Sequence, residues 1–181
     1  MKFWITTDTH FGHDKLVEYS SRPKDFGELI FKNLSVVKEE DILIHLGDFC
    51  IGNDEDWHSR FLSVKGTKWL VLGNHDHKSD SWYLSHGWDF VAQQFLIRKF
   101  GKSILFSHVP QKDLGYFDIN IHGHFHNNLH RLLEGRYIVP DEKERNKEDL
   151  AVLTDKHKLL AIEFTEYKPI LLDRFINSNT R

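Results

Sequence analysis

The sequence has few of the features that mark secreted or membrane-embedded proteins. It contains one cysteine, Cys50, in 181 residues, so no disulfide forms within the chain and a reducing compartment is expected. Its apolar runs are far shorter than the roughly 20 residues that cross a bilayer. The first of them ends by Thr6, too early for a signal peptide. We therefore expect a cytoplasmic protein with no membrane partner.

The sequence also lacks an excess of positive charge, since its formal net charge is −3. Binding to duplex nucleic acid requires a basic face, and we expect none. A small or single-stranded phosphate ester remains a possible partner, because a metal site supplies its own positive charge. No repeat or low-complexity linker interrupts the chain, so one domain is expected over residues 1–181. The run 141–149 carries both signs, which favours a solvated loop or helical turn over a partner-binding tail. The oligomeric state is left open.

Histidine, in contrast, is abundant, and metal-binding side chains follow five short apolar runs. Such runs, closed by Gly, Asp, Asn or Ser, are typical of buried strands. The runs and the polar residues after them are 3–7 with Asp8 and His10, 42–46 with Asp48, 68–72 with Asn74, 103–107 with His108, and 119–121 with His124 and His126. Ligands of open α/β sheets lie beyond the carboxyl ends of the strands. So many polar groups at one rim indicate a bound cation or substrate.

The segments that follow each of the first three runs have helical spacing. Apolar residues recur at helical intervals over 26–37, a second short helix opens at Asn53-Asp54, and a third opens at Ser79 and closes by Gly87. This alternation predicts parallel strands with helical crossovers. Later, 90–107 indicates a hairpin and 159–164 a further strand. A mixed sheet, or two packed sheets, is therefore favoured over a purely parallel one.

The polar residues suit a divalent cation. Asp8 and His10 are two residues apart, as are His124 and His126, so the members of each pair share a face if they lie on a strand. Asp48 follows a glycine that permits a tight turn, and its carboxylate can bridge two cations.

The neutral amide of Asn74 suits a site that also receives a phosphate, where another carboxylate would add negative charge. Mixed imidazole and carboxylate ligands favour Mn, Fe or Zn over Mg or Ca. Each motif alone is weakly specific. Their occurrence in this order, each after an apolar run, carries the prediction.

Five motifs occur in order: Asp8-x-His10, Gly47-Asp48, Gly73-Asn74-His75-Asp76, His108 and Gly123-His124-Phe125-His126. Together they resemble the motifs of the calcineurin-like metallophosphoesterases. The opening Asp8-Thr9-His10-Phe11-Gly12-His13 and the later Tyr167-Lys168-Pro169-Ile170 also resemble small stand-alone bacterial and phage members of that superfamily. The resemblance implies an α/β fold, a four-layer αββα sandwich of two mixed β-sheets flanked by helices.

The resemblance also implies roles for these residues around two divalent metal ions, manganese first, with iron, zinc or nickel as alternatives. One ion would be held by Asp8, His10 and His126, the other by Asn74, His108 and His124, with Asp48 bridging. A metal-bridging hydroxide would attack phosphorus in line with the leaving oxygen. His75 would protonate that oxygen or stabilise the transition state, with Asp76 orienting it.

Other residues near these motifs have less specific expectations. His45 is expected to be a hydrogen-bonded core histidine, and Cys50 a small buried apolar group. His122 is expected to support the site without binding metal. The same role, or a surface position, is favoured for His13 over substrate contact. Phe11 and Phe49 are candidates to line a substrate pocket.

Departures from the family's motifs narrow the range of expected substrates. Its protein Ser/Thr phosphatases follow Gly-Asp with two residues and then Asp-Arg, whereas Gly47-Asp48 here precedes Phe49-Cys50-Ile51-Gly52. Asp76 also stands where those enzymes have glutamate. The missing arginine disfavours a protein phosphatase and favours hydrolysis of a small or nucleotide-type phosphate ester, a diester slightly more than a monoester. A phosphomonoesterase or nucleotidase is the alternative, and a non-catalytic protein-binding scaffold, as in the retromer subunit, is the least favoured. The candidate arginines for phosphate contact are Arg22, Arg98, Arg131 and Arg136.

Overall fold

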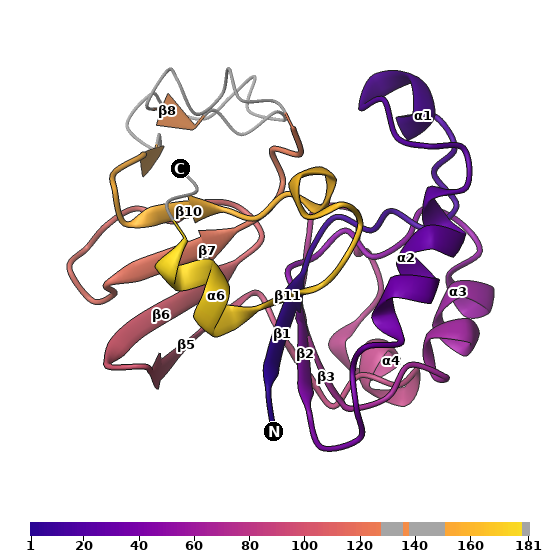
Figure 1. The fold of residues 1–181 in the computed structure, drawn as a ribbon, viewed down its shortest axis with the longest axis horizontal. Helices are drawn as coiled ribbons and strands as arrows, with labels where there is room; N and C mark the ends of the chain where they lie inside the picture. The colour runs from indigo at the N-terminus through magenta and orange to yellow at the C-terminus, as the bar shows by residue number, and fades with distance from the viewer. Residues whose placement is uncertain (128–135, 138–150, 179–181) are drawn as a thin grey trace.

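A computed structural model describes residues 1–127, 136–137 and 151–178, and places two β-sheets face to face (Figure 1). The first sheet has the strand order β11 (Ile170–Leu171), β1 (Phe3–Thr6), β2 (Ile42–His45), β3 (Thr67–Val71) and β4 (Phe90–Ala92). Strands β1 to β4 are parallel, and β11 pairs antiparallel with β1. The predicted crossovers of the first half are thereby confirmed.

The second sheet has the order β10 (His157–Leu159), β7 (Ile119–His122), β6 (Lys102–Ser107) and β5 (Gln94–Lys99). Strands β10, β7 and β6 are parallel, whereas β5 and β6 form the antiparallel hairpin that the sequence predicts. Residues 90–92, expected in that hairpin, instead form β4 of the first sheet. A two-stranded ribbon pairs β8 (Arg136–Tyr137) with β9 (Ala151–Val152).

Both faces of the first sheet are buried, and consecutive residues of its strands pack into different parts of the core. Leu43 and Leu70 belong to the core beneath the helices, whereas their neighbours Ile44 and Val71 face the second sheet. There they join Phe106 and other apolar residues of β6 and β7. Burial on both faces explains why these strands are short continuous apolar runs rather than alternating ones.

Helices α1 (Leu16–Tyr19), α2 (Phe26–Leu34), α3 (Asp54–Phe61) and α4 (Asp80–Ser85) lie on the side of the first sheet away from the second (Figure 1). The three predicted helices are α2, α3 and α4, and the Ser79 side chain caps α4 by accepting the Trp82 N–H at 3.2 Å. Helix α6 (Leu172–Asn177) contacts β1 and β11, and its buried residues join the core between the sheets. Two mixed sheets flanked by helices confirm the expected fold.

The strand predicted over 159–164 is wrong in most of its length. Strand β10 ends at Leu159, and a 3-10 helix, η2, spans Ile162–Thr165. The chain leaves the sheet after Leu160, whose N–H still donates to the His122 carbonyl, and it turns so that Ile162 joins the core under the helices. Apolar residues alone did not distinguish this buried turn from a strand.

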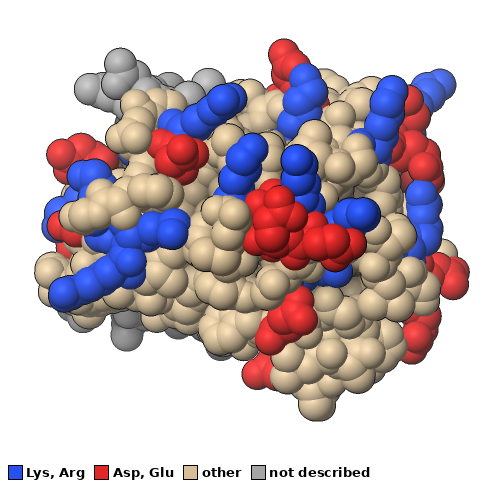
Figure 2. Space-filling view, turned by 60° about the horizontal axis from the view of Figure 1, so that its bottom comes forward, with Lys and Arg blue, Asp and Glu red and all other residues tan. Residues whose placement is uncertain are grey.

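The surface drawn in Figure 2 carries interspersed basic and acidic side chains. None of the helices in the described ranges is long and apolar enough to cross a membrane. The charged run 141–149 lies outside the described residues.

Candidate metal centre

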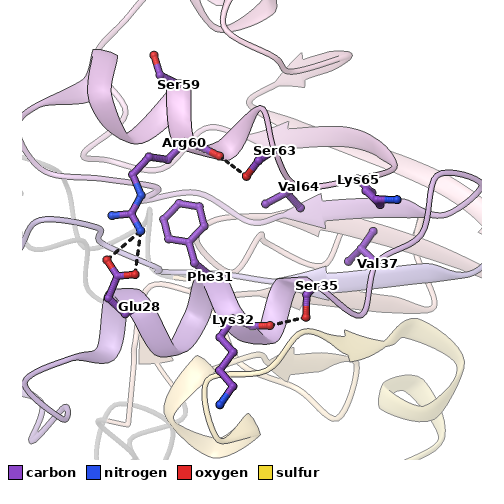
Figure 3. Close-up of a pocket in the computed structure, with 10 residues that line it drawn as sticks. All are labelled: Glu28, Phe31, Lys32, Ser35, Val37, Ser59, Arg60, Ser63, Val64 and Lys65. Carbon is purple, nitrogen blue, oxygen red and sulfur yellow. Dashed lines mark hydrogen bonds and ion pairs between the residues drawn. The ribbon is translucent and has the colours of Figure 1, made fainter.

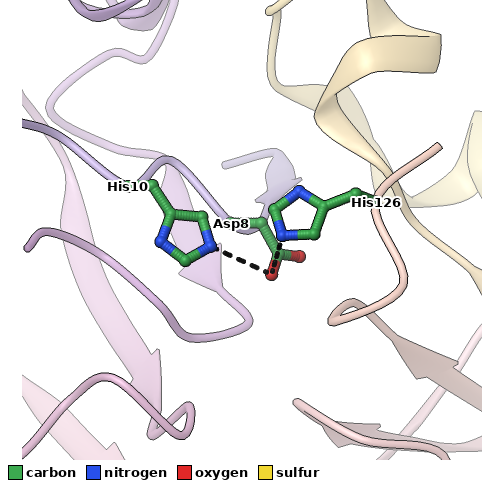
Figure 4. Close-up of side chains that lie close together, drawn as sticks. All are labelled: Asp8, His10 and His126. Atoms are coloured by element: carbon green, nitrogen blue, oxygen red, sulfur yellow. Dashed lines mark ion pairs between the residues drawn. The ribbon is translucent and has the colours of Figure 1, made fainter. Parts of the chain in front are cut away.

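The carboxyl ends of β1, β2, β3, β6 and β7 deliver the predicted ligands to two adjacent clusters. The first cluster holds Asp8, His10 and His126, whose imidazoles each direct Nε2 toward one oxygen of Asp8 (Figure 4). Both Nε2 atoms lie 3.9 Å from Asp8 Oδ1. Three ligand atoms of this type within 4.8 Å of one another can share a single cation.

The second cluster holds Asp48, His108 and His124. Nδ1 of His108 lies 2.7 Å from the Leu46 carbonyl, which can only accept, so Nδ1 carries the ring hydrogen. In a neutral ring the lone pair would then be on Nε2 of His108, which lies 3.0 Å from Oδ1 of Asn74 and 3.0 Å from Nδ1 of His124. Asn74 is thus placed with this cluster, as predicted.

Asp48 lies between the two clusters. Its Oδ2 atom is 3.5 Å from Nε2 of His10 and 3.4 Å from Nε2 of His108, one histidine from each cluster. Its Oδ1 atom accepts the His75 backbone N–H at 2.8 Å. One carboxylate therefore faces both candidate metal positions.

Five of the seven predicted ligands have a left-handed backbone. The φ angles are 47° at Asp8, 46° at His10, 56° at Asp48, 69° at His124 and 50° at His126. Residues other than glycine adopt this region at an energetic cost, and such residues cluster at functional sites. The paired ligands do not share a strand face, since all four lie beyond the ends of their strands.

Two glycines let the site backbone close around the carboxylates. A Cβ atom at Gly73 would collide with the Asp48 side chain, and one at Gly123 would collide with Thr7 and Asp8. The glycines of the predicted motifs thus serve close approach, which no other residue permits at these two positions.

Buried polar atoms without hydrogen-bond partners mark the first cluster. Oδ2 of Asp8 accepts from the Thr7 hydroxyl at 2.6 Å and from the His124 N–H at 3.0 Å. Oδ1 of Asp8 and Nε2 of His10 are buried and accept or donate no hydrogen bond. Buried polar atoms are nearly always satisfied, so these two atoms fit a cation between them.

The electrostatics of the clusters favour a cation over isolated charges. Burial lowers the pKa of His10 well below its usual value, which keeps the imidazole neutral and able to bind metal. Burial would also lower the pKa of His108, but the charge and hydrogen bond of Asp48 raise it to about 9. His108 in turn holds the pKa of Asp48 far below its usual range, against the effect of burial. A positive charge is thus favoured beside Asp48.

His75 and Asp76 are placed differently from each other. The His75 side chain is exposed, belongs to neither cluster, and its ring centroid lies 5.4 Å from that of His10. The Asp76 carboxylate accepts backbone N–H groups from Asp48 at 2.8 Å, Gly73 at 2.8 Å and Phe49 at 3.1 Å. The expectation that Asp76 orients His75 is therefore corrected: Asp76 ties together the two loops that carry Asp48 and Asn74.

The supporting histidines are buried or half-buried. His45 accepts the Gly47 N–H at Nδ1 and lies 2.9 Å from the Thr9 hydroxyl, which confirms a hydrogen-bonded core histidine. His122 is fully buried at the end of β7, outside both clusters. His13 is half-buried, with its ring centroid 5.7 Å from that of His10.

Phe11 and Phe49 do not line a pocket, because both are fully buried. They pack against each other and against Phe31, Trp57 and Phe61 in the core under the helices. Cys50 is buried there as expected, and burial raises the pKa of its thiol. A hollow of about 570 Å³ lies between α2 and α3 and includes no residue of the two clusters (Figure 3).

The structure adds three residues that the motifs did not indicate as parts of the site. Thr7 hydrogen-bonds Asp8, while Glu163 contacts both His126 and Arg22. Burial alone would raise the pKa of Glu163, but the His126 hydrogen bond and the Arg22 charge hold it at about 2. Arg22, considered for phosphate contact, is instead buried with its side chain engaged in the protein. Only Thr7, adjacent to a motif, had a local signal.

Residues 1–161 match the family described as calcineurin-like phosphoesterase. The chain belongs to this family. As a calcineurin-like phosphoesterase it has two candidate metal-binding clusters, in keeping with the dinuclear, metal-dependent character of the family.

Two relatives match the chain over nearly its whole length. An uncharacterized protein of Methanocaldococcus jannaschii is 26% identical, covering 97% of this chain and 89% of the relative. A crystal structure of a protein of unknown function from Aquifex aeolicus superposes with a TM-score of 0.70 at 28% identity, covering 97% of each chain. The fold therefore extends beyond the matched residues 1–161 into the C-terminal segment.

Proposed function

We propose that the protein is a dinuclear metal-dependent phosphoesterase that hydrolyses a small or nucleotide-type phosphate ester, with diesters preferred. The observation that carries the proposal is the position of Asp48 Oδ2, 3.5 Å from a histidine of one cluster and 3.4 Å from a histidine of the other. A carboxylate between two sets of imidazoles suits two adjacent divalent cations.

Asp8, His10 and His126 would hold one ion, Asn74, His108 and His124 the other, and Asp48 both. Imidazole-rich ligand sets favour manganese, iron, zinc or nickel over magnesium and calcium, and we propose manganese. When bound, the ions would polarise the phosphoryl oxygens and lower the pKa of a water nucleophile.

His75 is proposed as the proton donor to the leaving oxygen. Its exposed side chain stands beside the first cluster, and its backbone N–H is anchored to Asp48 at 2.8 Å. A group in this position is free to contact substrate without being held by a metal.

The proposed preference for diesters is based on the contacts that the arginines already make within the protein. A phosphomonoester carries a second negative charge near neutral pH and benefits from a guanidinium clamp. Arg22 is committed to Glu163, Asp8 and Thr9. Arg60 pairs with Glu28, and Arg98 is exposed on β5. Arg131 and the side chain of Arg136 lie outside the described residues. Arg22, the arginine that reaches the first cluster, is therefore not available to the substrate.

The partners and location proposed with this function are a small phosphoester substrate, no duplex nucleic acid, no membrane, and the reducing cytoplasm. The single cysteine and the mixed-sign surface support these assignments.

The test compares bis-p-nitrophenyl phosphate, p-nitrophenyl phosphate and 2′,3′-cyclic nucleotides, using protein stripped of metal and then reloaded with Mn²⁺. Hydrolysis that depends on Mn²⁺, and is faster for the diesters, is the expected result. Faster hydrolysis of p-nitrophenyl phosphate than of the diesters would favour the phosphomonoesterase alternative. Inactivity toward all three substrates with metal bound would favour the protein-binding scaffold.

A further inference from the structure

Glu163 lies beyond the residues matched to the family, yet its side chain reaches the first cluster. It belongs to η2, and its side chain is only 6% exposed. Its Oε1 atom lies 3.2 Å from Nδ1 of His126, on the side of the ring opposite the Nε2 atom that faces Asp8. The C-terminal segment thus contributes a carboxylate directly behind a predicted metal ligand.

The hydrogen bonds of Arg22 determine how Glu163 and His126 interact. Nη2 of Arg22 has two hydrogens, and it donates at 2.7 Å to the Asp8 carbonyl and at 2.7 Å to Glu163 Oε1. Nη2 also lies 3.2 Å from Nδ1 of His126, but both of its hydrogens are already used in the shorter contacts. Arg22 therefore has no hydrogen on Nη2 left to donate to the imidazole.

Nδ1 of His126 must then carry its own hydrogen and donate it to Glu163 Oε1. In a neutral imidazole this leaves the lone pair on Nε2, the atom that faces Asp8 Oδ1 at 3.9 Å. A carboxylate that accepts from the far nitrogen of a ligating histidine fixes both the tautomer and the ring orientation.

We propose that Glu163 is a positioning residue for the metal cluster of Asp8, His10 and His126, and that it holds His126 in its metal-binding tautomer. Arg22 in turn fixes Glu163 and, through the Asp8 and Thr9 carbonyls, the loop that carries the other two ligands. This inference rests on the proposed metal-dependent function. The competing role for Glu163 is a structural ion pair that only fastens the C-terminal segment.

The two roles differ in their effect on metal affinity. Glu163→Gln keeps the shape of the side chain but removes its charge. The amide oxygen is a weaker acceptor for His126 than a carboxylate, and the charge of Arg22 is left uncompensated. Glu166→Gln is the matched control, because Glu166 is exposed and its carboxylate pairs with Lys168 on the surface. Calorimetric titration of the metal-stripped full-length proteins with Mn²⁺ is expected to show one of two sites weakened by about 10- to 100-fold in Glu163→Gln. Glu166→Gln is expected to match the wild type.

Nitrogen-15 NMR of the histidine rings in the metal-free wild type supplies a second readout that needs no variant. We expect His126 to be protonated at Nδ1. A neutral His126 that carries its hydrogen on Nε2, or a Glu163→Gln protein that binds two Mn²⁺ ions as tightly as the wild type, would overturn the positioning role. A wild type that binds no Mn²⁺ would instead reject the proposed function on which it rests.

Discussion

Oδ2 of Asp48 lies 3.4 Å from Nε2 of His108, and neither residue has more than a few per cent of its surface exposed. Water does not screen such a pair, so the stability of the arrangement depends on which positive charge is present, a proton on the imidazole or a cation between the two groups. The same oxygen faces His10 of the other cluster, which makes Asp48 the residue on which both metal positions depend.

Asp48→Ala is expected to lower the metal content at both positions, because it removes the one carboxylate that both clusters share. Elemental analysis of protein dialysed against limiting Mn²⁺ measures this directly. Asp56→Ala is the control, since Asp56 is exposed on α3 and belongs to neither cluster. If Asp48→Ala retained two ions per chain, the bridging role would be rejected.

His75→Ala is expected to reduce kcat by about 10²- to 10⁴-fold, the usual contribution of a general acid, while metal content remains near two ions per chain. His77→Ala is the matched control, because His77 is also exposed and lies two residues further on. Loss of metal together with activity would show that His75 is a ligand and would contradict its assignment as proton donor.

Asp76→Ala is expected to destabilise the fold near the site, because it leaves the backbone N–H groups of Asp48, Phe49 and Gly73 without their acceptor. Each buried donor left unsatisfied costs about 1–3 kcal/mol, so we expect the free energy of unfolding to fall by several kcal/mol in urea titrations. Asp76→Asn keeps one acceptor oxygen, so its free energy of unfolding should lie between those of Asp76→Ala and the wild type. A variant as stable as the wild type would show that these loops do not depend on Asp76.

The buried histidine His45 is expected to make metal-free protein less stable as the pH falls. Burial lowers its pKa from 6.5 to about 3, so unfolding takes up a proton between these pH values. The stabilisation is complete above pH 6.5 and is lost toward pH 3, with a slope of up to about 1.4 kcal/mol per pH unit.

His45→Asn is the comparison, because the asparagine oxygen can still accept the Gly47 N–H but does not titrate. Urea unfolding in the presence of EDTA at pH 7.5, 6 and 5 is expected to show a shallower pH dependence for this variant. Equal slopes for the two proteins would exclude His45 as a contributor.

Activity is expected to fall below about pH 6, because the ligand imidazoles must be neutral to bind a cation and protons compete with the metal. Initial rates with bis-p-nitrophenyl phosphate at saturating Mn²⁺, measured from pH 4 to 9, test this expectation. Raising the Mn²⁺ concentration should shift the acidic limb to lower pH. An optimum near pH 4 would contradict metal-bound neutral histidines.

Much of this molecule follows from local sequence. The strands β1, β2, β3, β6 and β7 were predictable because each is a short apolar run closed by Gly, Asp or Ser. The helices α2, α3 and α4 were predictable from apolar residues at helical spacing and from the residues that open and close them. Because parallel strands place their carboxyl ends at one rim, the strand pattern also predicted that Asp8, Asp48 and His108 lie close to one another.

Tertiary structure alone decided the contacts between residues distant in the chain. Glu163 lies 141 residues from Arg22 and 37 from His126, and a single glutamate in an apolar stretch carries no signal of either contact. It also decided that Phe11 and Phe49 fill the core and that Asp76 binds backbone N–H groups rather than His75. The sequence by itself determined which side chains can bind metal and in what order they come. Folding determined which of their atoms face one another, because the left-handed turns after the strands and the buried Arg22–Glu163 pair exist only when both sheets and the C-terminal segment are packed together.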